Sequence, residues 1–576
     1  MLLSLLNILL LFFGVTLGLA WPLTARLALD SAEKLLATVL LSLVGVYLTA
    51  WSVYVFTLPS EINWVLPVVA CLGLALNRRA LAITLADEEV RHLLAAQLIV
   101  TGWCVGALAL VVSYSGGGWA GDWFGHWERM CFFLEHWPRE MKFDGFDAVT
   151  SRPPLVNVVE GFFLHGEKSS FAHYQFISTL FGSLAFLPAA VLARRFRLRE
   201  AFGGRFEGNR AIPVLAVLFM LNPLFVQNAT FAWTKLPAAF FTLTALHFFL
   251  RAHDNPAPRA VGWLFATSLA AGLLAHYSVG PYAVILAVSW AAYGRSKYRK
   301  LSWWRATGAL AFVGALVLAT WFAWAFAVYG VGGTFLTNTS VTEQASTRSA
   351  QLLVMALNLR DTLVPHFLRT VDSSFLAQRS PWGWWRDWFF QLYQVNFFFA
   401  FGSVVWAAII ALIARDWRSA SKECRLFWTA FVTGGMFLGV VVHGARDTWG
   451  LAHICLQPLV LLGLAFLAAR WASLSLGWRR ALLAGAALDF MLGIALHFGT
   501  QSYLLDRWLT PNQPVPESLL SYSQFATMNL RAKLQNHWVF LGDIFAAHTT
   551  TVLIALGALL LRALIRARGR ATVTPP

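Results

Sequence analysis

The chain has 576 residues, of which 58% are hydrophobic and only 12% are charged. A soluble domain carries roughly 25% charged residues, so the composition excludes an ordinary soluble protein. The net charge of +16 would suit a nucleic-acid-binding protein. The basic residues alternate with apolar segments, however, which is typical of loops on the cytoplasmic side of a membrane. Five cysteines without CxxC spacing indicate neither a disulfide framework nor a thiolate metal site.

Apolar segments that approach roughly 20 residues, the length that crosses a bilayer, recur along the whole chain. The first segment has no basic region ahead of it, so we expect a retained span and not a cleaved signal peptide. About fifteen spans are expected. They lie near 2–20, 35–58, 65–76, 93–113, 171–193, 211–227, 234–250, 260–275, 278–293, 306–330, 396–413, 426–442, 452–469, 481–498 and 549–565.

A single alternation of these spans places every short basic loop on one side. With the 114–170 loop outside, about two thirds of the Lys and Arg residues lie inside, and the net charge is about +19 inside and about −2 outside. The positive-inside rule then predicts an outside N-terminus and a cytoplasmic C-terminus. We expect a multi-pass protein of a bacterial inner membrane, with its chemistry on the outer face.

The expected fold is an all-α, polytopic transmembrane bundle with interfacial helices in the extracytoplasmic loops. Residues 1–92 are expected to add N-terminal helices to a core at 93–330, which includes the first outside loop, 114–170. Residues 331–395 form the second outside loop. The C-terminal helices at 396–576 include a third outside loop, 499–548.

The first outside loop begins with glycines and continues as a helix. An apolar stripe at helical spacing consists of Trp123, Trp127, Met130, Leu134 and Trp137. We expect this helix to lie in the membrane interface with its Trp side chains at the headgroup level. Asp122, His126 and Arg129 share another face. The helix would hold Asp122 just above the membrane, although an ordinary helix N-cap is the alternative role for this residue.

Cationic side chains occur in two other outside segments. Arg152 precedes Pro153 and Pro154, which favour an extended backbone. Its guanidinium matches a phosphate group in a bidentate manner, and a headgroup anchor is the alternative. Lys235 is the only basic residue of the turn 228–235. It either contacts a lipid phosphate or extends its charged end to the membrane interface, and the sequence leaves both roles open.

Two further outside turns are rich in titratable residues. One contains His276 and Tyr277, at the end of a helical hairpin. The other, 443–453, contains His443 and Arg446, and an ion pair of Arg446 with its neighbour Asp447 is the alternative to a binding role. Both turns are candidates for a binding site because charged groups are scarce in this chain.

The later part of the chain offers weaker signals. Asp489 stands alone in an apolar span, which indicates either function or a buried structural partner. The second outside loop has an apolar stripe at helical spacing, followed by an aromatic cluster at 382–390. The stripe consists of Leu352, Met355, Leu359, Leu363 and Phe367. Interfacial packing is the main interpretation of these residues, and a sugar- or lipid-binding platform is the alternative.

Taken together, these features resemble the GT-C superfamily of membrane glycosyltransferases, which includes protein O-mannosyltransferases and the bacterial transferases that add aminoarabinose to lipid A. The similarity is concentrated in the core at 93–330. The motifs that carry it are Gly121-Asp122-Trp123-Phe124-Gly125-His126-Trp127-Glu128-Arg129, Arg152-Pro153-Pro154-Leu155, Asn222-Pro223, Ala232-Trp233-Thr234-Lys235 and His276-Tyr277-Ser278.

The resemblance implies a dolichyl- or undecaprenyl-phosphate sugar as donor and a hydroxyl of a glycolipid, polysaccharide or protein as acceptor. Asp122 matches the family's essential acid and would be the general base. Many relatives have two adjacent acids, whereas Trp123 follows Asp122 here. Whether Glu128 supplies a second carboxylate stays open, and neither a metal site nor another cofactor is indicated.

The expected site residues follow from these matches. Asp122, His126 and Glu128 make up the expected catalytic group. The residues expected to bind the donor are Lys235, Arg446, His276, Arg152, His443 and Tyr277.

Two other functions stay open. A transporter or flippase of lipid-linked sugars would also be polytopic and aromatic-rich, but such proteins often show paired halves and broken midplane helices. The sequence shows neither feature. A polysaccharide polymerase or ligase would use the same type of donor with a longer glycan.

Overall fold

A computed structural model provides the structure of the chain. It describes residues 2–112, 114, 120–143, 148–165, 170–198, 211–254, 259–297, 300–337, 348–371, 381–441, 444–452, 456–498 and 539–568. His443 and most of the third outside loop therefore lie outside the described residues.

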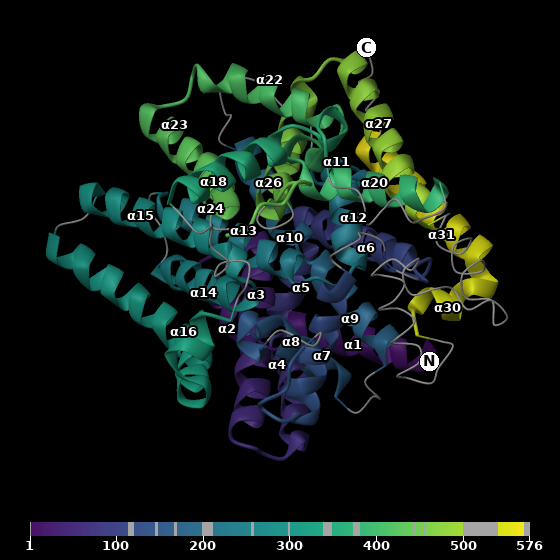
Figure 1. Cartoon of the computed structure of the whole chain (residues 1–576). Coiled ribbons are helices and arrows are strands. Elements are labelled where there is room, and N and C mark those ends of the chain that lie inside the picture. The colour runs from purple at the N-terminus through teal and green to yellow at the C-terminus, as the bar shows by residue number, and fades with distance from the viewer. Residues whose placement is uncertain are drawn as a thin grey trace, which may run out of the picture.

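Every regular element in the described ranges is a helix, as the sequence predicts (Figure 1). The N-terminal helices are α1 (Leu2–Gly18), α2 (Trp21–Thr24), α3 (Ser31–Val55), α4 (Val65–Leu76), α5 (Arg78–Ala86) and α6 (Glu88–Leu108). The following helices are α7 (Ala120–Glu135), α8 (Leu155–Leu164), α9 (Phe171–Ser183), α10 (Phe186–Leu198), α11 (Ala211–Leu221), α12 (Pro223–Thr230), α13 (Lys235–Ala252), α14 (Arg259–Ala275), α15 (Gly280–Lys297) and α16 (Lys300–Phe335).

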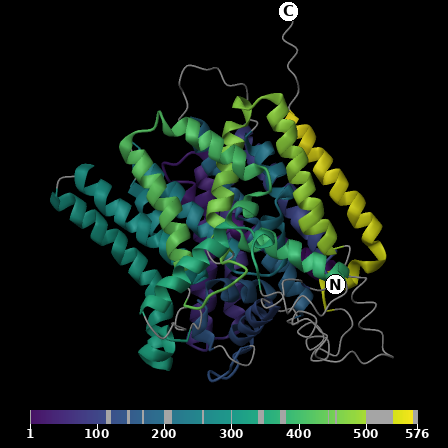
Figure 2. The same cartoon turned by 45° about the horizontal axis from the view of Figure 1, so that its top comes forward.

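The C-terminal part continues the helical pattern. Its helices are α18 (Arg348–Leu363), α20 (Pro381–Val395), α21 (Phe397–Phe401), α22 (Val405–Trp417), α23 (Lys422–Thr429), α24 (Gly435–Val441), α26 (Gln457–Arg470), α27 (Leu476–Phe490), α30 (Leu541–Phe545) and α31 (Thr549–Arg568). Helix α31 lies along one side of the molecule and α15 and α16 lie on the opposite side, as both views show (Figures 1 and 2).

Each expected span coincides with one helix or with consecutive helices, but not all of these helices have the length of a full crossing. In the described ranges, seven helical segments are long and apolar enough to cross a membrane, or nine if two bent pairs each count as one span. The pairs bend by 72° before α5 and by 69° between α11 and α12. The chain is thus an integral, multi-pass membrane protein with fewer full-length spans than the sequence predicts.

The bend between α11 and α12 has a local cause. Pro223 follows α11 and cannot donate a helical hydrogen bond. The Asn222 side chain caps α12 by accepting a bond from the Phe225 N–H at 2.8 Å. The same side chain donates to the carbonyl of Ala400 at 3.0 Å, which ties the bend to α21.

Ion pairs join the ends of four helices on the side that the sequence predicts to be cytoplasmic. Arg194 of α10 contacts Asp30 at 2.7 Å and Glu89 at 2.9 Å, which lie at the starts of α3 and α6. Glu33 of α3 is buried and pairs with Arg251 of α13 at 3.1 Å. A buried carboxylate needs such a partner, so this network fixes the relative position of the four helices.

Asp489 has buried hydrogen-bond partners, which is the structural one of the two roles that the sequence left open for it. Its carboxylate accepts hydrogen bonds from the Tyr393 hydroxyl at 2.9 Å and from the Ser403 N–H at 2.8 Å. The chain turns at Gly402, whose φ of 114° favours glycine. The carboxylate therefore holds the start of α22 against α27.

The two apolar stripes of the outside loops have different surroundings. Trp123 and Trp127 of α7 are buried inside the protein, with 0% and 3% exposure, so the prediction that these two side chains contact the headgroups is wrong. They pack against Phe171 of α9, at 5.0 and 6.2 Å between ring centroids. On α18, by contrast, Leu352 is exposed while Asp361 is fully buried, so the polar side of that helix faces the protein.

Helix α30 packs against Val111, just after the end of α6, and the contact leaves no room for a side chain at Gly542. The Gly542 N–H donates to the Val111 carbonyl at 3.0 Å, and a Cβ at Gly542 would overlap that carbonyl group. Gly542→Ala should therefore lower the free energy of unfolding by about 1–3 kcal/mol through overpacking. Thermal unfolding in detergent measures the change. Gly557→Ala in α31 is the control, because nothing lies within 4 Å of its added carbon; equal destabilisation of both variants would contradict this packing.

Candidate functional site

The first turn of α7 presents Asp122 at a partly exposed position. Its side chain is 32% exposed, and its Oδ1 lies 3.5 Å from a guanidinium nitrogen of Arg152. Arg152 has the extended backbone expected before Pro153, with φ −133° and ψ 142°. This segment therefore turns the guanidinium towards the start of α7.

A second cation comes from the start of α13. Lys235 is 6% exposed, and its Nζ lies 3.7 Å from the centroid of the Trp233 ring, a cation–π contact. The preceding Ala232 has a φ of 55°, which is uncommon for a residue with a side chain. Such local strain is frequent at functional sites, where the surrounding structure maintains it.

Two buried histidines are electrostatically coupled to these cations. Burial lowers the pKa of His126 well below its usual range, and the positive charges of Arg129, Arg152 and Lys235 lower it further. The pKa of His276 is lowered in the same way by burial and then by Arg152 and Lys235. Both imidazoles are therefore neutral at neutral pH. These electrostatic interactions also show that four parts of the chain meet at one site. They are α7, the extended segment around Arg152, the start of α13 and the end of α14.

The ring of His276 is held in a defined orientation. Its Nδ1 accepts a hydrogen bond from the Ser278 N–H at 3.0 Å. A neutral imidazole that accepts at Nδ1 carries its proton on Nε2, so His276 offers an N–H donor there. Its neighbour Tyr277, in η4 (Tyr277–Val279), donates to the carbonyl of Thr150 at 3.3 Å, which joins this turn to the Arg152 segment.

Glu128 does not form a carboxylate pair with Asp122. The two are six residues apart on α7, which places them about 120° apart around the helix. His126, four residues from Asp122, shares its face instead. Glu128 is buried, with 6% exposure. Its neighbour Arg129 donates to the Ser151 hydroxyl at 2.8 Å and thereby supports the Arg152 segment.

Arg446 occupies a second ionic cluster, around Asp361 of α18. The Asp361 carboxylate is fully buried and lies 3.2 Å from Arg446, 2.6 Å from Arg360 and 3.1 Å from Arg369. Asp447 accepts a bond from the Trp449 N–H at 2.8 Å. Arg446 is thus paired with Asp361, and in the described part of the chain no recorded contact joins it to the Asp122 site. Its contact with a donor stays a prediction.

Within the described ranges, no three His, Cys, Asp or Glu side chains lie together in a way that would hold a metal ion.

Sequence reasoning missed two polar residues of α8. Asn157 and Glu160 are each 1% exposed and lie in the helix that packs against α7. The signal was present in the sequence, because they interrupt the apolar run Leu155–Leu164 in the way that Asp489 interrupts its span.

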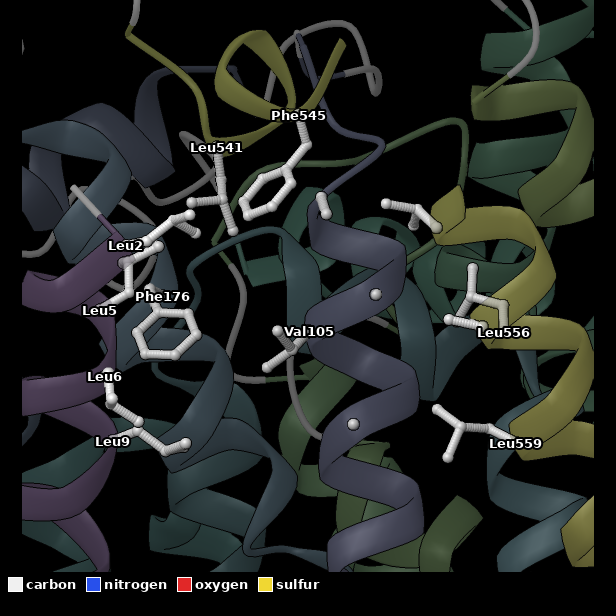
Figure 3. Close-up of a pocket in the computed structure, with 15 residues that line it drawn as sticks. Leu2, Leu5, Leu6, Leu9, Val105, Phe176, Leu541, Phe545, Leu556 and Leu559 are labelled. Carbon is white, nitrogen blue, oxygen red and sulfur yellow. The ribbon is translucent and has the colours of Figure 1, made fainter. Parts of the chain in front are cut away.

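An apolar cavity of about 340 Å³ lies between α1, α6, α9, α30 and α31 (Figure 3). Its lining includes Leu5, Val105, Phe176, Leu541 and Leu556. Phe540, next to Leu541, lies 6.0 Å from Trp123 of α7 between ring centroids. The cavity is therefore close to the helix that carries Asp122.

No family model and no curated protein matches the chain. Two crystal structures of ArnT from Cupriavidus metallidurans are similar to it. The complex with undecaprenyl phosphate has 14% sequence identity and a TM-score of 0.43, and the match covers 83% of this chain and 75% of that chain. The apo structure has 15% identity and a TM-score of 0.42, with 84% and 73% covered. At these low values, no shared ligand, reaction or site residue follows from the similarity.

The Asp361 cluster leads to a stability prediction. Asp361→Asn should lower the free energy of unfolding by about 3–5 kcal/mol, because it leaves the buried guanidinium group of Arg369 without its counter-charge. Thermal unfolding in detergent measures the loss. Arg360→Gln is the control and should cost less than about 1 kcal/mol, since this Arg side chain is 49% exposed. A similarly small effect of Asp361→Asn would show that the cluster does not hold α18 in place.

Proposed function

We propose that the protein is a membrane glycosyltransferase that moves a sugar from a polyprenyl-phosphate donor to an acceptor hydroxyl, with inversion. The observation that carries the proposal is the convergence of one partly exposed carboxylate, Asp122, with Arg152, Lys235 and two neutral histidines. The reaction takes place at the extracytoplasmic face of a bacterial inner membrane. The N-terminus then lies outside and the C-terminus lies in the cytoplasm.

The cationic side of the site suits the phosphate of the donor. With both imidazoles neutral, Arg152 and Lys235 outweigh the single charge of Asp122. A phosphate group binds most strongly where cations are already fixed in a poorly hydrated environment. Lys235 is held over Trp233, and the Nε2–H of His276 adds a neutral donor. The apolar cavity beside α7 supports a donor with a hydrocarbon chain, because its lining is almost wholly carbon.

Asp122 is placed to accept the proton of the acceptor hydroxyl. As the acceptor oxygen forms its bond to the anomeric carbon, the hydroxyl proton passes to the Asp122 carboxylate. The bond between that carbon and the phosphate oxygen breaks, and the polyprenyl phosphate departs with the electron pair. Arg152, now 3.5 Å from Asp122, can turn to the leaving phosphate and stabilise its charge.

The alternatives differ in whether a covalent product forms. A transporter or flippase of lipid-linked sugars moves the donor intact, whereas a transferase releases free polyprenyl phosphate. A polymerase or ligase also releases the lipid carrier, but it extends or transfers a longer glycan. Purified protein with a radiolabelled polyprenyl-phosphate sugar distinguishes them through the fate of the label.

Asp122→Asn tests the base. The amide cannot accept the proton, so the rate of transfer should fall by about 10²–10⁴-fold. Release of polyprenyl phosphate measures the rate, and an unchanged thermal unfolding midpoint shows that the variant is folded. Retention of wild-type activity by this variant would rule out Asp122 as the base. Glu128→Gln, measured alongside, shows whether the second acid of α7 takes part.

Lys235→Ala tests donor binding. Loss of a charge-assisted contact worth about 1.5–3 kcal/mol should raise the donor concentration at half-maximal rate by about 10–100-fold. A donor titration at fixed acceptor gives this value. Lys142→Ala, which removes an exposed Lys beyond the C-terminal end of α7, should leave the titration unchanged. Identical titrations for wild type and Lys235→Ala would contradict a phosphate-binding role.

A further inference from the structure

Helix α8 contains two polar side chains that the reaction outlined above does not use. Asn157 and Glu160 are each 1% exposed, and the ten-residue helix is otherwise apolar apart from Gly161. It is too short to cross a membrane and lies between the spans α6 and α9. A buried carboxyl group is costly, so Glu160 requires an explanation.

The packing of α8 on α7 places Asn157 near the site. A Cβ at Gly161 would lie 3.7–3.8 Å from atoms of Leu134 and Met130 of α7. One turn earlier on α8 lies Asn157, and one turn before Met130 on α7 lies His126. Asn157 is close enough to His126 to affect its pKa. Glu160 follows Asn157 at i+3 and therefore lies on the same side of α8.

These three neighbouring side chains have polar atoms without a hydrogen-bond partner in the described part of the chain. The atoms are Nδ1 of His126, Oδ1 and Nδ2 of Asn157, and Oε1 and Oε2 of Glu160. Buried polar groups are nearly always paired, either with protein atoms or with ordered water. Asn157 interacts with His126 and affects its pKa, yet the atoms named above have no close hydrogen-bond partner, and a bridging water suits that arrangement.

The surroundings of Glu160 favour its neutral form. Burial raises its pKa to about 8, although the Ser178 hydroxyl of α9 acts in the opposite direction. Tyr174 of α9 is coupled to Glu160, and also to Cys131 and Arg129 of α7. Of the other helices in contact, α1 has no titratable side chain and α14 has only Arg259, at its first residue. In α3, Tyr47 bonds to Thr320 and Tyr54 stacks on His136.

We propose that Glu160 is a positioning residue, which in its neutral form orients the His126 imidazole through Asn157 and ordered water. This inference rests on the proposed function for its link to sugar transfer. The neutral carboxyl group can both donate and accept hydrogen bonds, so it can complete a chain of water and amide to Nδ1 of His126. Ionisation removes its donor and places a negative charge behind His126, which favours the imidazolium and alters the hydrogen bonds at the site.

The sign of the pH effect follows from this chemistry. Below pH 8 most Glu160 is protonated, so the hydrogen-bonded chain from Glu160 to His126 is complete. As the pH rises through 8, the protonated fraction falls, and at pH 9 about one tenth remains. The wild-type rate at pH 9 should therefore be about one tenth of its rate at pH 7. Glu160→Gln cannot ionise, so its ratio of rates at the two pH values should be close to 1.

Transfer assays at pH 7 and pH 9 compare wild type, Glu160→Gln and Glu135→Gln, an exposed acid of α7 that serves as the control. Glu135→Gln should keep the wild-type ratio. Equal ratios for wild type and Glu160→Gln would overturn the link between Glu160 and the reaction.

Infrared spectroscopy of the purified protein tests the same inference without activity. Wild type at pH 7 should show a carboxylic-acid C=O band that is absent in Glu160→Gln and disappears above pH 9. The band should shift in His126→Ala, because the two groups share a hydrogen-bonded chain. Absence of the band, or no shift, would overturn the inference. If no polyprenyl-phosphate sugar reacts, the proposed function fails, and the infrared result alone decides the state of Glu160.

Discussion

The site depends on the way α7 is held inside the protein. Trp123 and Trp127 are buried against α9, and burying one aromatic side chain removes about 150–250 Å² from solvent. That packing fixes the rotation of α7 about its axis. With the Trp face inside, Asp122 and His126 at i and i+4 point towards the starts of α8 and α13 and the end of α14. A rotated α7 would separate the carboxylate from the cations that surround it.

Burial and positive charge act together on the chemistry of this site. Poor hydration keeps His126 and His276 neutral, and the nearby Arg152 and Lys235 reinforce that state. Neutral imidazoles leave the cationic charge to Arg152 and Lys235, whose groups are fixed by an ion pair and by a ring contact. An anion that enters such a site finds fixed charges and little water to reorganise, and electrostatic stabilisation is most effective under these conditions.

The buried carboxylates of this protein fall into two groups according to their partners. Asp489 accepts from Tyr393 and Ser403, and Asp361 is surrounded by guanidinium groups, so both are satisfied and hold helices in place. The Glu160 carboxyl group interacts with the Ser178 hydroxyl of α9, but in the described ranges its oxygens, the amide of Asn157 and Nδ1 of His126 have no close hydrogen-bond partner. Unpaired polar groups that gather beside the proposed site point to bound water, whereas paired ones point to stability.

The sequence alone determined where the helices lie and which residues carry charge near their outer ends. Apolar length located nearly every helix, and the rarity of charge in apolar surroundings made Asp122, Arg152, Lys235 and His276 candidates, to which only the family resemblance assigned roles. Only the tertiary structure decided which of these groups meet, because the spacing of residues along a chain does not fix the rotation or tilt of a helix against its neighbours. For this reason the Trp face of α7 turned inward, Arg446 paired with Asp361, and Glu160 was buried within α8 and its neighbours.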